Sequence, residues 1–139
     1  CRREYYYSGR DKGRQKTDKE FSDDLTTWLA GESIHAVILD PAAASFKAQL
    51  EKDGYKVKKA KNDVLDGIRF VATLLLAGSI FVDSSCENLI KEFASYIWDA
   101  KAGERGEDKP VKEHDHALDA LRYFCYTIIR GVGGMKILK

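Results

Sequence analysis

The sequence predicts an α/β domain in which helices cover both faces of a central sheet. Apolar, β-prone segments alternate with amphipathic helical segments, and strands separated by helices normally pair in parallel. The chain of 139 residues has the length of one domain, so a single domain is expected over residues 1–139. Its 44% apolar and 32% charged residues are typical of a folded globular protein.

The first elements are predicted from aromatic content and from capping residues. The aromatic residues 3–8 (REYYYS) favour a strand, and the charge-dense residues 10–19 indicate a loop. Thr17, with Glu20 three residues later, forms a capping box for a helix that Gly31 ends.

The middle of the chain contains the most apolar predicted strand. Residues 34–39 (IHAVIL) are almost continuously apolar, as expected of a central strand. Pro41 is well placed to begin a helix that runs to Asp53. Residues 55–60 (YKVKKA) alternate like a half-exposed strand.

A helix and a short strand are expected next. Asn62 is the predicted cap of a helix that Gly78 ends, and residues 79–83 (SIFVD) favour a strand. Ser84 and Glu87 predict a second capping box.

Two helices complete the predicted order. The first follows that capping box and runs to Trp98, and a polar loop then occupies residues 101–113. The last helix is expected to begin near Asp115 and to end at Gly131, with an apolar stripe facing the core.

Cysteine usage and hydropathy bear on the compartment. The three cysteines are odd in number and form no CxxC pair, which favours a reducing, cytosolic compartment with Cys86 and Cys125 as small core residues. The longest apolar run, residues 70–77, is far shorter than the ~18–20 residues of a membrane span. No secretory signal opens the chain.

Several classes of function are excluded by missing motifs. The sequence has no GxxxxGK[ST] loop, no GxGxxG turn after a strand, no GxSxG elbow and no HExxH or paired CxxC motif. A net charge of +1 also argues against nucleic-acid binding through bulk charge. Any chemistry must therefore come from scattered carboxylates and histidines.

Asp40 is the first candidate site residue. It follows the most apolar predicted strand, and ligands of open α/β sheets gather at the carboxyl ends of strands. An aspartate before a proline is also a good helix cap. Both interpretations are compatible, because a cap uses one carboxylate oxygen and leaves the other free.

Asp115, His116 and Asp119 form the second candidate group. They cluster at a predicted helix start, and His116 and Asp119 are three residues apart, so both reach one side of the helix. The structural alternative is that Asp115 caps the helix, Asp119 pairs with Arg122 and the histidines are solvated. Metal binding is the functional interpretation.

Carboxylates with one or two imidazoles suit Mg²⁺ or Mn²⁺ better than Zn²⁺. Two such ions about 4 Å apart stabilise the attacking and leaving oxygens in phosphodiester cleavage. Asp40 on a strand end and Asp119 on a helix face would converge from distant elements, as that chemistry requires.

Basic residues gather in two patches that could follow a phosphate backbone. The first lies in the loop before the first predicted helix and includes Arg10, Lys12 and Arg14, and the second includes Lys58 and Lys59. The structural alternative is a solvated face or an edge strand protected by lysines.

Residues 115–123 (DHALDALRY) resemble the closing motif of the large subunits of phage terminases. Residues 4–9 (EYYYSG), 37–42 (VILDPA), 61–68 (KNDVLDGI) and 96–99 (YIWD) resemble segments of that family in the same order. The chain is thus similar, over nearly its whole length, to the C-terminal nuclease domain of PBSX-type phage or prophage terminases.

The resemblance implies an RNase H-like fold with a central mixed sheet and helices on both faces. It implies an endonuclease that cuts concatemeric double-stranded DNA during genome packaging, using Mg²⁺ or Mn²⁺, in the cytoplasm of a bacterial host. The full protein would also work with an ATPase domain, a small terminase subunit and a portal. Carried over by motif, Asp40 and Asp119 bind metal, Asp115 is a neighbouring candidate ligand and His116 orients a ligand or the attacking water.

One departure from the family pattern concerns the start of the chain. RNase H-like domains normally begin with a β-hairpin whose first strand carries another metal-binding aspartate. This chain opens at what resembles the third strand, so the hairpin strands and that aspartate are expected to be missing, together with the ATPase domain.

The sequence therefore predicts a metal-dependent endonuclease domain of a terminase large subunit. Two alternatives stay open. One is another RNase H-like nuclease or integrase, and the other is a non-catalytic module that docks DNA or the portal. A docking module should be indifferent to Mn²⁺.

Overall fold

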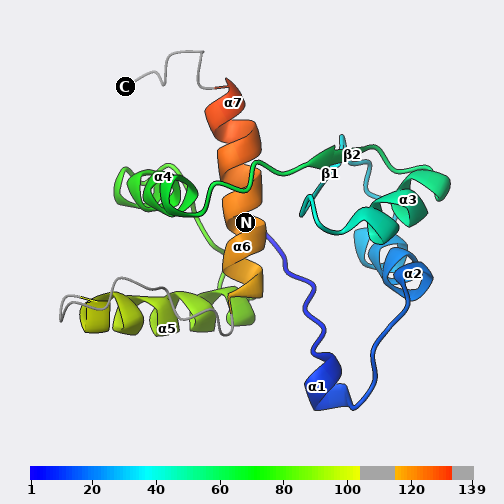
Figure 1. The fold of residues 1–139 in the computed structure, drawn as a ribbon, viewed down its shortest axis with the longest axis horizontal. Helices are drawn as coiled ribbons and strands as arrows, with labels where there is room; N and C mark the ends of the chain where they lie inside the picture. Colours follow the sequence, from blue (N-terminus) through cyan, green and yellow to red (C-terminus); the bar gives the residue numbers. More distant parts are fainter. Residues whose placement is uncertain (104–114, 133–139) are drawn as a thin grey trace.

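The computed structural model describes residues 1–103 and 115–132 (Figure 1). In chain order the elements are α1 Gly9–Lys12, α2 Asp18–Leu29, β1 Val37–Leu39, α3 Ala44–Lys52, β2 Val57–Lys59, α4 Val64–Leu76, α5 Glu87–Gly103, α6 His116–Phe124, the π-helix η1 Cys125–Ile129 and α7 Arg130–Val132. The predicted alternation of strands and helices is confirmed in the middle of the chain.

The helix formed by α6, η1 and α7 lies between two groups of elements (Figure 1). On one side it packs against α4 and α5, and on the other side α6 packs against β1. Strands β1 and β2 lie in the second group together with α2 and α3. Helix α6 therefore contacts elements of both groups.

The sheet in the described residues has two strands, β1 and β2, which pair in parallel. Val37 faces Val57 and Leu39 faces Lys59 in the register. Helix α3 connects the two strands and contacts both α2 and β2. Parallel pairing across a helix was predicted, although both strands are three residues long and shorter than the apolar segments that predicted them.

The strand predicted over residues 3–8 is wrong. The backbone there is irregular, and the tyrosines contact the polar segment that follows: Tyr7 donates its hydroxyl to the Arg14 carbonyl at 2.6 Å, and Tyr5 donates to Asp24. A strand needs a partner for its backbone groups, and aromatic content does not supply one.

The strand predicted over residues 79–83 is wrong for the same reason. These residues form no regular ladder in the described structure, and Cys1 is the residue far away in sequence that hydrogen-bonds to them. The Cys1 amino group donates to the Phe81 carbonyl at 2.6 Å, and the Asp83 amide donates to the Cys1 carbonyl at 2.9 Å.

The capping box of α2 is confirmed. The Thr17 side chain accepts a hydrogen bond from the Glu20 amide, and the Glu20 side chain accepts one from the Thr17 amide. The preceding loop differs from its prediction because it contains the short helix α1, which Ser8 caps and Gly13 ends at φ +64°. Glycine adopts this left-handed conformation without strain.

Two other predicted helix starts are wrong. Helix α3 begins at Ala44 rather than Pro41, after a turn that the Asp40 side chain stabilises. Helix α4 has Asp63 at its N-cap, and the Asp63 side chain makes no capping hydrogen bond. The predicted cap, Asn62, instead accepts a hydrogen bond from Arg122.

The capping box predicted from Ser84 and Glu87 is also wrong. The amides of Asn88 and Leu89, in the first turn of α5, donate to the Glu4 carboxylate at 2.7 and 3.0 Å. A carboxylate at a helix N-terminus satisfies amides that have no partner within the helix and interacts favourably with the helix dipole. The N-terminal segment therefore supplies this cap.

Helix α5 runs to Gly103, beyond the Trp98 end predicted. Of the predicted loop over residues 101–113, the first three residues are helical and residues 104–113 lie outside the described residues, as does His114. No helix in the described residues is long and apolar enough to cross a membrane.

A small apolar core joins α4 to the last helix. Val71, Leu74 and Cys125 are its buried members. Partly buried side chains packed against them are Phe70, Leu75, Ile80, Leu121 and Ile129. The prediction that Cys86 and Cys125 are core residues is confirmed, since neither is exposed.

Candidate functional site

The predicted acidic and histidine residues meet in one cavity. A cavity of about 620 Å³ is lined by Asp40 from the end of β1 and by Asp115, His116 and Asp119 from the start of the last helix. The apolar part of its wall comes from one face of α4, with residues Val64, Ile68, Val71, Ala72 and Leu75, together with Phe93 and Leu118. All four acidic and histidine candidates therefore line the same cavity.

Both carboxylate oxygens of Asp40 accept hydrogen bonds. Oδ1 accepts from the Ala42 amide at 2.8 Å, which stabilises the turn after β1, and Oδ2 accepts from the Tyr123 hydroxyl at 2.7 Å. The expectation that capping would leave one oxygen free is therefore wrong, because Tyr123 contacts the other. Asp40 also caps no helix, since α3 begins later.

The hydrogen bond from Tyr123 holds the pKa of the Asp40 carboxyl below its usual value. The Ala42 amide and the positive charge of Arg122 act in the same direction, against the effect of burial. Burial, with the bond to Asp40, raises the pKa of Tyr123 to about 12. At neutral pH Asp40 is therefore ionised and Tyr123 is the proton donor.

Asp119 forms an ion pair with a buried arginine. Nε and Nη2 of Arg122 donate to Asp119 Oδ1 at 3.3 and 2.9 Å. The Arg122 side chain is 5% exposed and that of Asp119 is 36% exposed. The predicted structural pairing is thus confirmed, and Asp119 Oδ2 has no hydrogen-bond donor among the described residues.

Asp115 and His116 occupy the first positions of α6. Asp115 is the N-cap residue but its side chain makes no capping hydrogen bond, contrary to the structural alternative for this residue. The cap comes from Glu92 of α5, whose Oε2 accepts from the Leu118 amide at 2.8 Å. His116 is exposed, as that alternative predicted.

The cavity residues suit a hard divalent cation in the kind of donors they offer. Carboxylate oxygens with an imidazole are typical of Mg²⁺ and Mn²⁺ sites, and Asp119 Oδ2 is available. These residues supply fewer ligand atoms than a divalent cation needs to be held by protein groups alone. Within residues 1–103 and 115–132 no three His, Cys, Asp or Glu side chains are close enough together to hold an ion.

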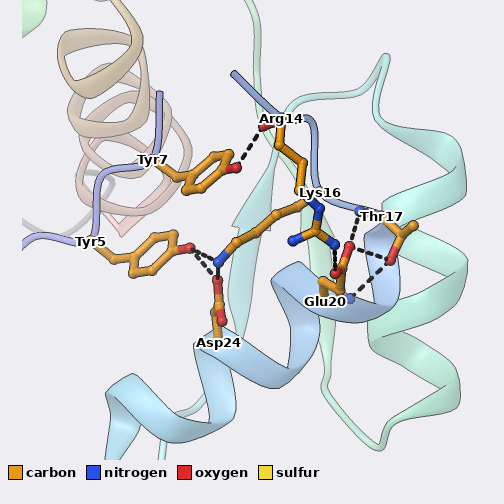
Figure 2. A network of polar contacts seen from close by, with 7 residues as sticks. All are labelled: Tyr5, Tyr7, Arg14, Lys16, Thr17, Glu20 and Asp24. Carbon is orange, nitrogen blue, oxygen red and sulfur yellow. Dashed lines mark hydrogen bonds and ion pairs between the residues drawn. The ribbon is translucent and has the colours of Figure 1, made fainter. Parts of the chain in front are cut away.

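The five predicted DNA-binding residues do not form one surface. Arg10 and Lys12 are exposed on α1, whereas Lys58 and Lys59 lie on β2, well apart from α1 in Figure 1. Figure 2 shows that the Arg14 guanidinium contacts Glu20. Arg14 therefore has a carboxylate partner, whereas no ion pair involves the other four within the described residues.

A polar network holds the segment after α1 against α2 (Figure 2). The Lys16 ammonium contacts Asp24 and lies 4.6 Å from the centre of the Tyr7 ring. Tyr5 donates to the same aspartate. Tyr5 and Tyr7 therefore hold this segment against α2 and are not part of a strand.

Sequence reasoning missed the residues that hold the site together. Tyr123 and Asn62 were not candidates, although both lie within motifs that were singled out. Glu92 is the clearest omission, because it is only 5% exposed. The sequence pattern that could have identified Glu92 is its position three residues after Leu89, which places a carboxylate on the buried side of an amphipathic helix.

The fold and the cavity together define an α/β domain with an acidic site at the end of its parallel strands. The family model for the terminase RNaseH-like domain matches residues 33–126, and the chain belongs to this family. The resemblance to terminase large subunits and the RNase H-like fold are thereby confirmed.

Relatives of known identity agree. The chain is 32% identical over 132 residues to the terminase large subunit of Escherichia phage T5, covering 91% of the chain and 30% of that protein. It is 52% identical to the large terminase of a thermophilic bacteriophage, with a TM-score of 0.83 over 91% of the chain and 33% of that structure. A second structure of that large terminase, in complex with ATP-γ-S, matches equally well. The chain spans about a third of the length of these relatives.

Proposed function

We propose that this chain is the nuclease domain of a terminase large subunit and cleaves concatemeric double-stranded DNA in a reaction that depends on Mg²⁺ or Mn²⁺. The observation that carries the proposal is that Asp40 and Asp119, from separate elements, line one cavity with His116. Membership of the terminase RNaseH-like domain family supports the assignment of the chain as an RNase H-like terminase domain.

Each site residue has a proposed role that its contacts support. Asp40, kept ionised by Tyr123, and Asp119, with Oδ2 available, would hold the cation, and Asp115 would be a neighbouring ligand. His116, exposed at the start of α6, would orient a ligand or the attacking water. The cation would supply charge stabilisation to the attacking and leaving oxygens of the phosphodiester.

The basic residues would contact the DNA backbone. Lys59 pairs with Leu39 in the sheet register, and Leu39 directly precedes Asp40, so β2 ends beside the strand that leads into the acidic site. Arg10 and Lys12 would contact phosphates elsewhere. In the whole protein we propose an ATPase domain, the small subunit and the portal as partners, in the host cytoplasm.

A plasmid-nicking assay tests the proposal. The chain is incubated with supercoiled DNA in Mn²⁺, Mg²⁺ or EDTA, alongside Asp40→Asn and the control Asp66→Asn. Asp66 is an exposed acid on α4 whose contact with Arg69 is 3.8 Å long, and it is outside the cavity. We expect cutting with metal, none with EDTA, at least about a 100-fold loss in Asp40→Asn and no change in the control.

Circular dichroism of each variant shows whether the fold is retained. Equal cutting by wild type and a folded Asp40→Asn would mean that another site, or a contaminating nuclease, cuts the DNA. Absence of cutting with every metal would contradict an autonomous nuclease.

The second candidate is a non-catalytic module that docks DNA or the portal. The specific observation in its favour is that no three potential ligands cluster in the described residues. Such a module would bind DNA equally well with Mn²⁺ and with EDTA, which a gel-shift measurement decides.

A further inference from the structure

Two consecutive residues of α6 contact the two principal carboxylates of the site. Arg122 Nη2 donates to Asp119 at 2.9 Å, and the Tyr123 hydroxyl donates to Asp40 at 2.7 Å. Both are buried, with 4% and 9% of their surfaces exposed. Because Asp40 belongs to the end of β1 and Asp119 to α6, one dipeptide fixes carboxylates from two different elements.

Arg122 is itself held in place by the two residues that precede α4. Its Nη2 also donates to the Asn62 side chain at 3.2 Å, and its Nη1 donates to the Asp63 carbonyl at 3.5 Å. A guanidinium has donors in a fixed planar arrangement, so contacts on one side constrain the other side. The orientation of Asp119 is therefore set partly by the residues that precede α4.

Gly67 of α4 provides the space for Arg122. An added Cβ at Gly67 would lie 2.8 Å from both Cγ and Cδ of Arg122, which is closer than real side chains approach. Glycine is unfavourable inside a helix relative to alanine. The close approach of the arginine stem gives a physical reason for glycine at this position.

We propose that Arg122 and Tyr123 are positioning residues that hold Asp119 and Asp40 in the orientation a divalent cation requires. This inference rests on the function proposed above. Groups that hydrogen-bond to metal ligands fix their orientation, and losing one typically weakens metal binding or activity about 10- to 100-fold.

Mn²⁺ binding, measured from the electron paramagnetic resonance signal of the free ion, tests the inference without using activity. The variants are Tyr123→Phe, which removes only the hydroxyl, Arg122→Lys, which keeps the charge, and Gly67→Ala, which changes no polar group. The control is Gly131→Ala on α7, where an added Cβ meets no atom of the described residues within 4 Å.

We expect about a 10-fold weaker Mn²⁺ affinity in each of the three variants and wild-type affinity in the control. In the nicking assay, excess Mn²⁺ should restore cutting by Tyr123→Phe while its affinity for DNA stays unchanged. A purely structural role would lower the unfolding temperature but would not move the Mn²⁺ affinity of the folded protein.

The outcomes separate the two proposals. Wild-type binding of Mn²⁺ with unchanged affinity in the folded variants overturns the positioning role and leaves the proposed function intact. A wild-type chain that binds no Mn²⁺ overturns both. If Gly67→Ala fails to fold, Tyr123→Phe and Arg122→Lys decide.

Discussion

At the scale of single residues, Glu92 is a buried carboxylate that is only partly hydrogen-bonded within the described residues. One carboxylate oxygen accepts the Leu118 amide, and the other, Oε1, is buried without a hydrogen-bond partner among the described residues. Burial raises the pKa of the Glu92 carboxyl above its usual value, although the amides of Leu118 and Ala117 oppose the shift. The folded protein therefore holds this proton more tightly than the unfolded chain does.

Glu92→Gln should change the pH dependence of stability. Between the usual carboxyl pKa and the raised one, unfolding of the wild type releases a proton, so the Glu92 contribution to the free energy of unfolding falls as pH rises. Glutamine keeps an acceptor for the Leu118 amide and carries no charge. The variant should thus gain stability relative to wild type as the pH rises above the usual carboxyl pKa of about 4, measured by urea unfolding. A difference that is constant with pH would contradict this account.

Local sequence rules predicted the acidic and histidine residues that line the site, but they did not predict most of the hydrogen bonds that these residues make. Asp40, Asp115, His116 and Asp119 could be placed together because strand ends and helix starts have fixed geometry. The contact of Tyr123 with Asp40 could not, because 83 residues separate the two and no periodicity relates them. Such contacts depend on how α6 packs against β1.

At the scale of elements, two helices are capped by side chains from other elements. Glu4 of the N-terminal segment caps α5, and Glu92 of α5 caps α6. Both interactions join segments that are distant in sequence, so they stabilise tertiary structure as well as helix ends. The capping box of α2 is the local counterpart, because Thr17 and Glu20 lie within one turn.

Glu4→Ala should destabilise the protein by about 1–2 kcal/mol, the usual cost of losing a helix cap. Three hydrogen bonds to Glu4 disappear, from the Asn88 amide, the Asn88 side chain and the Leu89 amide. The matched control is Ser84→Ala, which removes the exposed serine that sequence predicts as the cap. Urea unfolding should show a loss for Glu4→Ala only. A larger loss of stability for Ser84→Ala would indicate that Ser84, rather than Glu4, caps α5.

Helices with two independent signals were predicted well, whereas strands were not. The helix now seen as α2 had both an apolar stripe and a capping box, and each is present. The segments 3–8 and 79–83 had only composition in their favour, and composition does not specify a partner strand. The π-helix after α6 also has no local signal that would have predicted it.

At the scale of the whole molecule, the two groups of elements meet at α6. One group, containing β1, carries Asp40, and the last helix, packed on α4 and α5, carries Asp119. Hydrogen bonds also connect the last helix to the segments that contain Asp40 and Lys61. The Tyr123 hydroxyl donates to Asp40, and the Lys61 amide donates to the Thr127 hydroxyl of η1 at 2.9 Å. A cation held by both aspartates would add a further connection between these parts.

Mn²⁺ should therefore raise the unfolding temperature of the whole chain in a single transition. A ligand that binds only the folded state adds stability as its concentration exceeds its dissociation constant, about 2.7 kcal/mol at 100 times that constant. Differential scanning calorimetry with increasing MnCl₂ measures the shift, and Asp40→Asn should abolish most of it while Asp66→Asn should retain it. An equal shift in Asp40→Asn would show that Mn²⁺ binds elsewhere. A shift confined to one of two separate transitions would show that the cation stabilises one group of elements without joining it to the other.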